Sequence, residues 1–408
     1  MHSLKKHSVL ALGYFLLIAL LGLLLRLFPV VELPINYRFL VHTHSHIALL
    51  GWTYTALTTL IYKAYLSKAS IERRYRMLFW CTQGTIIGML LTFPFTGYAL
   101  LSIVFSTLFL IASYIFMWFF VKHTIAAQKK THAYKCIYAS LWYMVLSSLG
   151  PWALGAIMNT AGSGSDLYRN AIYFYLHFQY NGWFVMALLG LLLYFLEQRK
   201  IELPHIGFKQ FFWFMNLGVM ATFCISLLWM KPSNSVYIIS LLGSVMQLFA
   251  FFILIKHVLP FKSKVNRMDS KLFYLSLKIA AIFFLVKVFL QLLGSVPYFA
   301  SIVSSNIDLV IGYLHWIFLG VVSLTVLAFL FHSKLIELSR TSIILYLLGF
   351  MLTEGLIFYK GAMAWIKEPV MQYYPWLLLF ASCLLVIAIG SIVILQLRQT
   401  LVQKLRLK

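Results

Sequence analysis

Twelve apolar runs follow one another along almost the whole chain, and each is about 20 residues long. A run of that length lets an α-helix cross the hydrocarbon layer of a membrane. Because lipid offers no hydrogen-bond partners, a spanning segment must pair its own backbone groups, which favours helices. The runs cover residues 8–28, 39–62, 77–97, 99–121, 136–158, 170–196, 208–230, 236–255, 272–294, 309–331, 342–363 and 373–396.

Composition supports this interpretation. Hydrophobic residues make up 62% of the 408 residues and charged residues only 11%, whereas about a quarter of a soluble domain is charged. This excludes a soluble enzyme, a disordered chain and a disulfide scaffold. No loop between runs is long enough for a folded module. We therefore expect an all-α polytopic bundle of twelve transmembrane helices, a single membrane domain over residues 1–408 with no soluble domain, surrounded by the lipid bilayer.

Basic residues predict the direction of the spans. The chain has 33 Lys and Arg against 10 Asp and Glu, a formal charge of +23, which in a soluble protein would suggest a nucleic-acid partner. Here the cations alternate between loops: with the N-terminus inside, the inner segments carry 25 of them and the outer loops 5, when Lys209 and Lys360 at the edges of their runs are counted with the neighbouring loops. Inner loops of membrane proteins are enriched in Lys and Arg. We expect both termini to be cytoplasmic, in the bacterial inner (plasma) membrane, with no nucleic-acid partner.

Five of the twelve histidines lie inside the runs, all in runs that enter from the outer face. Three of them follow a charged residue by seven or eight positions, which places their imidazoles roughly 10–12 Å below the outer surface. Each alone could be an interhelical hydrogen-bonding residue, but histidines from three spans at one depth favour a metal or haem site. These three are His46, His177 and His315, preceded by Arg38, Arg169 and Asp308; the other two are His42 and His44.

The HTHSH segment contains three of the five histidines. His42 and His46 share a helix face at i, i+4, whereas His44 points elsewhere. Depth selects His46 as the ligand, so His42 and His44 suit an entry path or contacts with a haem edge. A haem wedged between helices needs axial ligands at similar depth, a condition that His46 and His315 meet. Cations near the outer interface that could contact its propionates are Arg26, Arg38, Lys360 and Lys367.

Three short stretches resemble a known family. The segment HTHSHIALLGW (42–52) resembles the second-span stretch that supplies the low-spin haem ligand in the catalytic subunit of the haem–copper oxidase superfamily. YLHFQYNGWF (175–184) resembles the sixth-span motif of its nitric-oxide reductase branch, and GYLHWIFLG (312–320) resembles its tenth span. The resemblance implies an oxidoreductase-like haem protein for electron transfer or O2/NO redox chemistry near the outer face. It also implies a separate electron donor, a quinol or a cytochrome.

The sequence departs from that family at three points. The seventh span lacks the adjacent histidines that complete a copper or non-haem iron site, and the tenth span has one histidine where two haems need two. The tyrosine expected at i+4 from His177 is absent, with Tyr180 at i+3. We therefore expect one haem, held by His46 and His315, and an incomplete ligand set for copper or non-haem iron. A small membrane partner subunit could supply the missing ligands.

His177 keeps several roles open. It could replace His315 on the iron, or join His46 and His315 in a three-histidine site, which suits zinc or copper. It could also bind a solitary metal together with His42 or His44. A last possibility is that it forms hydrogen bonds with Asn181 and Gln179 that remain from a lost site.

Two further ionisable residues lie deep in the runs. Glu354 is near the middle of the eleventh run and Lys287 lies in the ninth. A proton-relay role or a mutual structural pairing would explain them. They keep a second function open, a twelve-span transporter with a histidine metal or proton site, which predicts transport without a chromophore.

Overall fold

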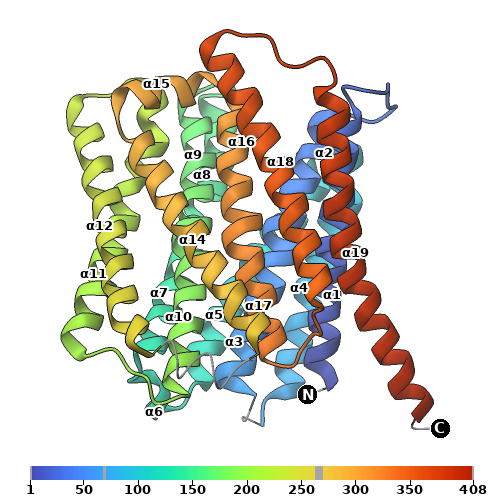
Figure 1. Ribbon diagram of the computed structural model, residues 1–408, viewed down its shortest axis with the longest axis vertical. Helices are drawn as coiled ribbons and strands as arrows, with labels where there is room; N and C mark the ends of the chain where they lie inside the picture. The colour runs from blue at the N-terminus through green and yellow to red at the C-terminus, as the bar shows by residue number, and fades with distance from the viewer. Residues whose placement is uncertain (1, 68–69, 262–269, 407–408) are drawn as a thin grey trace. The chain divides into compact units, whose positions relative to one another are not determined.

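In a computed structural model, the chain folds as a bundle of long helices (Figure 1). The structure describes residues 2–67, 70–261 and 270–406, and all regular secondary structure in these ranges is helical. Within them, eleven helices are long and apolar enough to cross a membrane. The protein is therefore an α-helical integral membrane protein. The eleven are Ser3–Leu27, Glu72–Thr96, Leu100–His123, His132–Thr160, Asp166–Glu197, His205–Met230, Asn234–Phe261, Lys271–Gly294, Ile307–His332, Arg340–Ile366 and Tyr374–Gln399.

The second predicted span is not among these eleven. Its residues are nevertheless helical without a break from Tyr37 to Leu66. This helix alternates between α-helical and π-helical hydrogen bonding along its length. The α-helical parts are α2 (Tyr37–His46) and α3 (Thr55–Ile61), and the π-helical parts are η1 (Ile47–Tyr54) and η2 (Tyr62–Leu66). The count of twelve spans and the sides on which the termini lie stay predictions.

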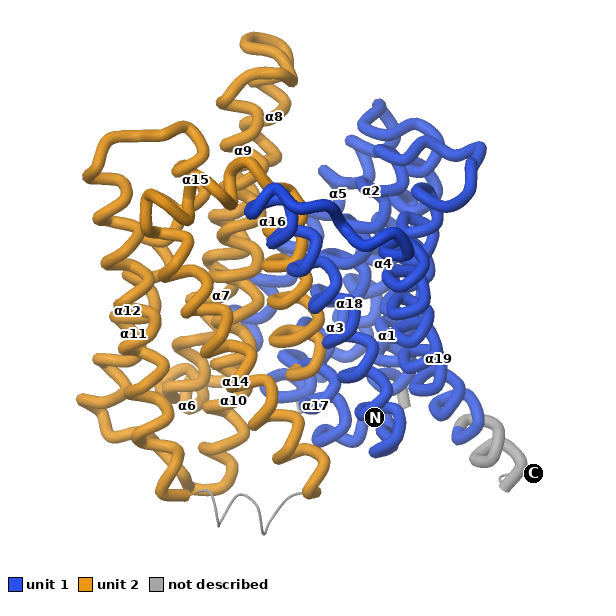
Figure 2. The backbone as a smooth tube through the Cα atoms, turned by 45° about the horizontal axis from the view of Figure 1, so that its top comes forward, with its two compact units in different colours: residues 1–123, 326–408 blue, residues 124–325 orange. Residues whose placement is uncertain are grey.

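Contacts divide the chain into two compact units (Figure 2). Unit 1 combines both ends of the chain, residues 1–123 and 326–408, and unit 2 is the stretch 124–325 between them. The boundary falls within α17 (Leu324–His332). The prediction of one membrane domain over the whole chain stays a prediction.

The last two helices of the chain belong to unit 1 and pack within it. The first helix packs against the last, and the last two pack on each other. Both chain ends lie at the lower end of Figure 1. Besides the Tyr37–Leu66 segment and most of α17, the helices of unit 1 are α1 (His2–Leu27), α4 (Glu72–Thr96), α5 (Leu100–His123), α18 (Arg340–Ile366) and α19 (Tyr374–Arg406).

Unit 2 is built around helix pairs that are close in sequence, such as α11 with α12 and α7 with α10. The helices of unit 2 are α6 (Ala126–Lys129), α7 (His132–Ser147), α8 (Leu149–Thr160), α9 (Asp166–His177), η3 (Phe178–Phe184), α10 (Val185–Glu197), α11 (His205–Thr222), η4 (Phe223–Met230), α12 (Asn234–Val258), η5 (Leu259–Phe261), α14 (Lys271–Gly294), α15 (Pro297–Ser305), α16 (Ile307–His315) and η6 (Trp316–Ser323).

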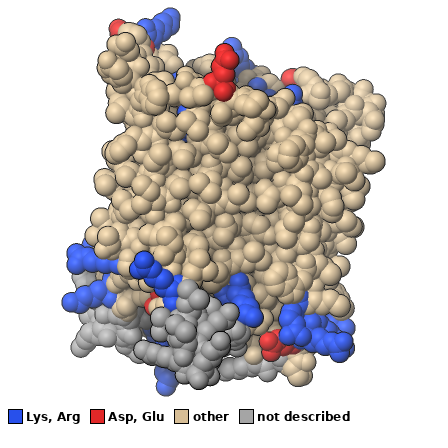
Figure 3. Space-filling view, turned by 90° about the vertical axis from the view of Figure 1, so that its right-hand side faces the viewer, with Lys and Arg blue, Asp and Glu red and all other residues tan. Residues whose placement is uncertain are grey.

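Most of the charged side chains on the surface lie near the ends of the helices. On the face in Figure 3, the broad middle carries no Lys, Arg, Asp or Glu, and Lys and Arg gather towards one end. An apolar middle with charged ends is the surface that a bilayer requires.

Candidate functional site

Each of the three predicted site histidines stands where an α-helix changes into a π-helix. The α-helices that end at His46, His177 and His315 are 10, 12 and 9 residues long, and a π-helical segment begins at the next residue in every case. Single π-helical turns are rare and frequently lie at functional sites. The three α-helices also begin alike, with a side chain that accepts a backbone N–H: Asn36, Ser165 and Asn306.

A glycine follows each histidine by five residues, which is the hydrogen-bond spacing of a π-helix. The glycines are Gly51, Gly182 and Gly320. Two of them allow a neighbouring tyrosine ring to approach: a methyl group on Gly51 would lie 3.1 Å from Cγ of Tyr14, and one on Gly182 would lie 2.5 Å from Cγ of Tyr143. The chain thus contains the same histidine–π–glycine arrangement three times.

Gly182→Ala tests this packing. We expect the variant to lose about 1–3 kcal/mol of unfolding free energy, because the added methyl group overlaps the Tyr143 ring in a filled core. Gly155→Ala is the matched control, since a methyl group at that helical glycine meets no atom within 4 Å. Thermal unfolding in detergent measures both variants. Equal melting temperatures for the two variants would contradict the packing argument.

His46 has one nitrogen tied to the backbone. Its Nδ1 lies 2.8 Å from the carbonyl oxygen of His42, and because a carbonyl only accepts, Nδ1 carries the proton. The Nε2 lone pair of the neutral ring is therefore available to an acid or a metal. At present it faces the Tyr98 hydroxyl at 3.4 Å, a long contact. The ring also packs at 4.3 Å against Phe93. One N–H held by a carbonyl is the usual state of a metal-ligating histidine.

The other residues of the HTHSH segment diverge as expected. His42 lies on the same face as His46, since both rings contact Tyr98, at 4.7 and 5.7 Å. His44 faces α1 instead, with its Cε1 atom 3.2 Å from the position of a methyl group on Gly22. The prediction that His44 points away from the other two is confirmed. Arg38 is exposed one helical turn before His42.

His177 is held at both ring nitrogens within unit 2. Its Nε2 donates to the carbonyl oxygen of Val219 at 2.8 Å, and its Nδ1 accepts from the Asn181 amide at 3.2 Å. The ring is 2% exposed. Its proton is thus on the opposite nitrogen from that of His46. Of the roles left open for His177, hydrogen bonding to Asn181 is observed, whereas the Oε1 atom of the predicted partner Gln179 has no partner among the described residues.

A buried lysine lies in the same unit. The Lys287 ammonium donates to Oε1 of Gln247 at 3.1 Å and to Oε1 of Gln291 at 2.6 Å. All three side chains are at most 4% exposed. Lys287 is also within electrostatic reach of His177. Its predicted pairing with Glu354, a residue of unit 1, stays a prediction.

Further hydrogen bonds extend this polar cluster in two directions. Gln247 donates to the Thr222 hydroxyl at 2.9 Å, and this hydroxyl donates to the Gly218 carbonyl at 2.7 Å. It also lies 3.2 Å from the Val219 carbonyl that accepts from His177. In the other direction, Tyr313, which lies two residues before His315, donates from its hydroxyl to Oε1 of Gln291 at 3.3 Å. The cluster therefore links the helix that ends at His177 to the helix that ends at His315.

Sequence reasoning found the five histidines and Lys287 but missed Gln247, Gln291 and Tyr313. Glutamines inside apolar runs were a signal for the first two, and the repeated histidine–glycine spacing was a signal for the π-helices. Among the described residues, no group of three or more His, Cys, Asp or Glu side chains could hold a metal ion. His46 belongs to unit 1 and both His177 and His315 to unit 2, so the haem pair and the three-histidine site stay predictions.

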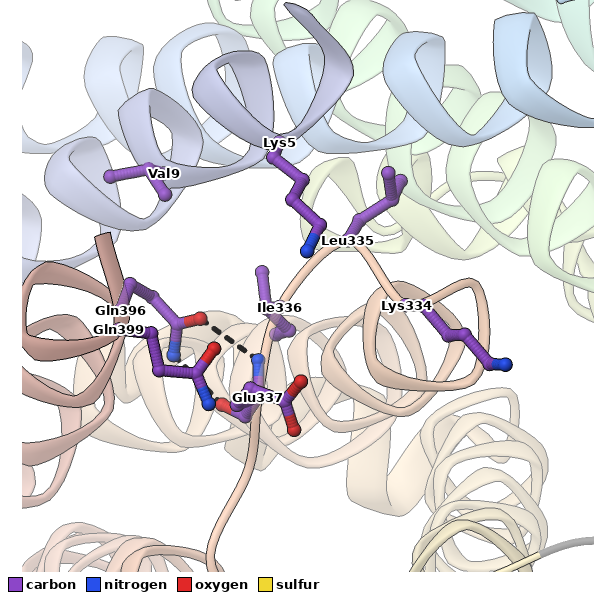
Figure 4. Close-up of a pocket in the computed structure, with 8 residues that line it drawn as sticks. All are labelled: Lys5, Val9, Lys334, Leu335, Ile336, Glu337, Gln396 and Gln399. Atoms are coloured by element: carbon purple, nitrogen blue, oxygen red, sulfur yellow. Dashed lines mark hydrogen bonds between the residues drawn. The ribbon is translucent and has the colours of Figure 1, made fainter. Parts of the chain in front are cut away.

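A pocket in unit 1 contains none of these histidines (Figure 4). It lies between the start of α1, the loop after α17 and the later part of α19, and its cavity has a volume of about 40 Å³. The pocket is therefore separate from the candidate histidine site.

No family model and no curated protein matches the sequence. The likeness of the three histidine stretches to an oxidase family thus rests on short motifs alone.

Proposed function

We propose that the protein is a haem-binding integral membrane protein in which Nε2 of His46 is an axial ligand of the iron. Its proposed role is electron transfer or O2/NO-related redox chemistry, with electrons from a separate quinol or cytochrome. The observation that carries the proposal is the bond from His46 Nδ1 to the His42 carbonyl, because it leaves Nε2 as the basic atom. The π-helix that begins after His46 supports a functional site at this position.

The surroundings of His46 fit a haem in chemical character. Phe93 supplies an aromatic wall against the imidazole, and Arg38 offers a guanidinium for a propionate, with which it can form paired hydrogen bonds. The Tyr98 side chain contacts both His42 and His46. Its hydroxyl would have to move away from Nε2 of His46 before this atom could bind iron. When bound, the haem supplies the one-electron chemistry, and the chain binds and orients it. The second axial ligand stays the predicted His315.

An optical spectrum with metal analysis tests the proposal. The full chain is purified in mild detergent from cells supplied with a haem precursor. We expect a Soret band, and iron in a ratio of about one per chain. A colourless preparation without iron, obtained while the helical circular dichroism is intact, would exclude the proposal.

The buried lysine of unit 2 favours a second candidate, a transporter that couples to protons or cations. Ionisable side chains within a membrane are expensive and mark ion pathways, and Lys287 is held there by neutral amide oxygens. This candidate predicts that proteoliposomes containing colourless protein move protons or a metal ion, as reported by a trapped fluorescent dye. Lys287→Met should abolish that flux, and unchanged flux in the variant would count against the role of Lys287.

A further inference from the structure

Three polar side chains of the pocket in unit 1 make no bond with another residue that the structure describes. The pocket is lined by apolar Val9, Leu335 and Ile336 and by five polar residues. Among the described residues, no hydrogen bond or ion pair engages the Lys5 ammonium, the Glu337 carboxylate or the Gln399 amide. Polar groups that face a pocket without internal partners are available to a ligand. The remaining lining residues are Lys334 and Gln396.

The wall of this pocket is held in place before any ligand arrives. The backbone N–H of Glu337 donates to Gln396 Oε1 at 2.8 Å, and the Gln396 amide donates back to the Glu337 carbonyl at 2.8 Å (Figure 4). Gln396 is 5% exposed, and Leu335 and Ile336 beside it are buried. A preformed wall loses little conformational entropy when a ligand binds.

The charges of the pocket are mixed in sign. Lys5 and Lys334 provide two ammonium groups and Glu337 provides one carboxylate. In Figure 4, the Lys5 side chain extends from α1 towards the loop, the Glu337 carboxylate lies beyond Ile336, and the Lys334 ammonium points away from both. Lys5 and Glu337 are therefore the opposed charges within the pocket. A ligand that offers an anion to Lys5 and a cation with N–H groups to Glu337 matches both charges.

We propose that this pocket binds the phosphoethanolamine headgroup of a membrane phospholipid. Its phosphate would accept from Lys5, and its primary ammonium would donate to Glu337 and to the Gln399 amide oxygen. A choline headgroup has no N–H to donate to Glu337, and a glycerol headgroup has no cation. The pocket is lined by Lys5 near the start of α1 and by Lys334 just after α17, and lipid headgroups contact membrane proteins at such basic helix ends.

Native mass spectrometry of the full chain tests the proposal. The purified protein is mixed separately with phosphatidylethanolamine, phosphatidylcholine and phosphatidylglycerol of identical acyl chains, and the retained lipid is counted. Lys5→Gln should lower retention of phosphatidylethanolamine, and Glu337→Gln should remove the preference over phosphatidylcholine. Lys6→Gln is the matched control, because this neighbouring lysine is exposed and does not line the pocket. It should bind like the unchanged protein.

Two results of the lipid-binding experiment would contradict the proposal. Equal retention of the three lipids by the unchanged protein would overturn the proposal, and so would equal losses in Lys5→Gln and Lys6→Gln. A thermal shift with soluble glycerophosphoethanolamine distinguishes the source of the headgroup. If the soluble compound stabilises the protein as much as the lipid does, the site belongs to a free metabolite and the lipid proposal is wrong. Circular dichroism confirms that each variant is folded.

Discussion

Replacement of His46 by alanine is expected to remove the haem from the purified protein. The change deletes Nε2, the atom proposed to bind iron, together with the Nδ1 proton that now fixes the ring on the His42 carbonyl. A methyl group offers no donor to iron, so the Soret absorbance per chain should fall to background. Iron content, measured on the same sample, should fall with it. His46→Met should keep part of the haem with a shifted spectrum, because a thioether is also an axial ligand.

His123 provides the matched control in the same unit. Its Nδ1 lies 2.9 Å from the Phe119 carbonyl, the same i−4 backbone bond that His46 makes. His123 ends α5, far along the chain from the HTHSH segment, and His123→Ala should leave the Soret band unchanged. Full haem content in His46→Ala would contradict the assignment. Equal loss in both variants would trace the effect to general instability of the unit.

The second large effect is expected in unit 2, where Gln247→Leu should lower the unfolding free energy by about 2–4 kcal/mol. The change removes one of two amide oxygens that accept from Lys287 and also the donor to Thr222. A buried ammonium that loses an acceptor keeps its desolvation cost without the bond that offset it. The measurement is unfolding in detergent, followed by tryptophan fluorescence. Gln210→Leu, at an exposed glutamine of α11, should have no comparable effect.

A double variant identifies the cause of this loss. If the stranded ammonium is responsible, Gln247→Leu combined with Lys287→Met should be more stable than the sum of the single variants predicts. The coupling should be about 0.5–3 kcal/mol, the range for residues in direct contact. Strictly additive effects would show that Lys287 does not depend on Gln247, and that the polar cluster is not cooperative.

Hydropathy predicted the helices because it sums a strong local signal over some 20 residues. The same locality explains the success at HTHSH, since the directions of His42, His44 and His46 follow from helical spacing alone. The π-helices were missed because spacing arguments assume 3.6 residues per turn, and an extra residue in a turn is tolerated only where neighbouring helices allow it. Tyr14 and Tyr143 beside the glycines belong to such neighbouring helices. No local sequence signal shows that these two tyrosines pack there.

The polar cluster illustrates a different reason for failure. Gln247, Lys287 and Gln291 lie on two helices, and Tyr313 lies on a third. Their contacts depend on how far each helix is shifted along its neighbour, a quantity that single-sequence patterns do not contain. The sequence shows that a buried lysine needs partners, but only the packed unit identifies two glutamines.

Unit 1 is built from two stretches of the chain that flank unit 2, and this arrangement determines the order in which the two units can be completed. During synthesis, residues 124–325 emerge as a continuous stretch and can complete unit 2 early. The HTHSH segment leaves the ribosome before them, yet its unit is finished only when α18 and α19 arrive and α19 packs against α1. Domains generally fold as units during synthesis. A ligand of His46 would therefore meet a finished unit only after α19 is made, so loading follows the synthesis of α19.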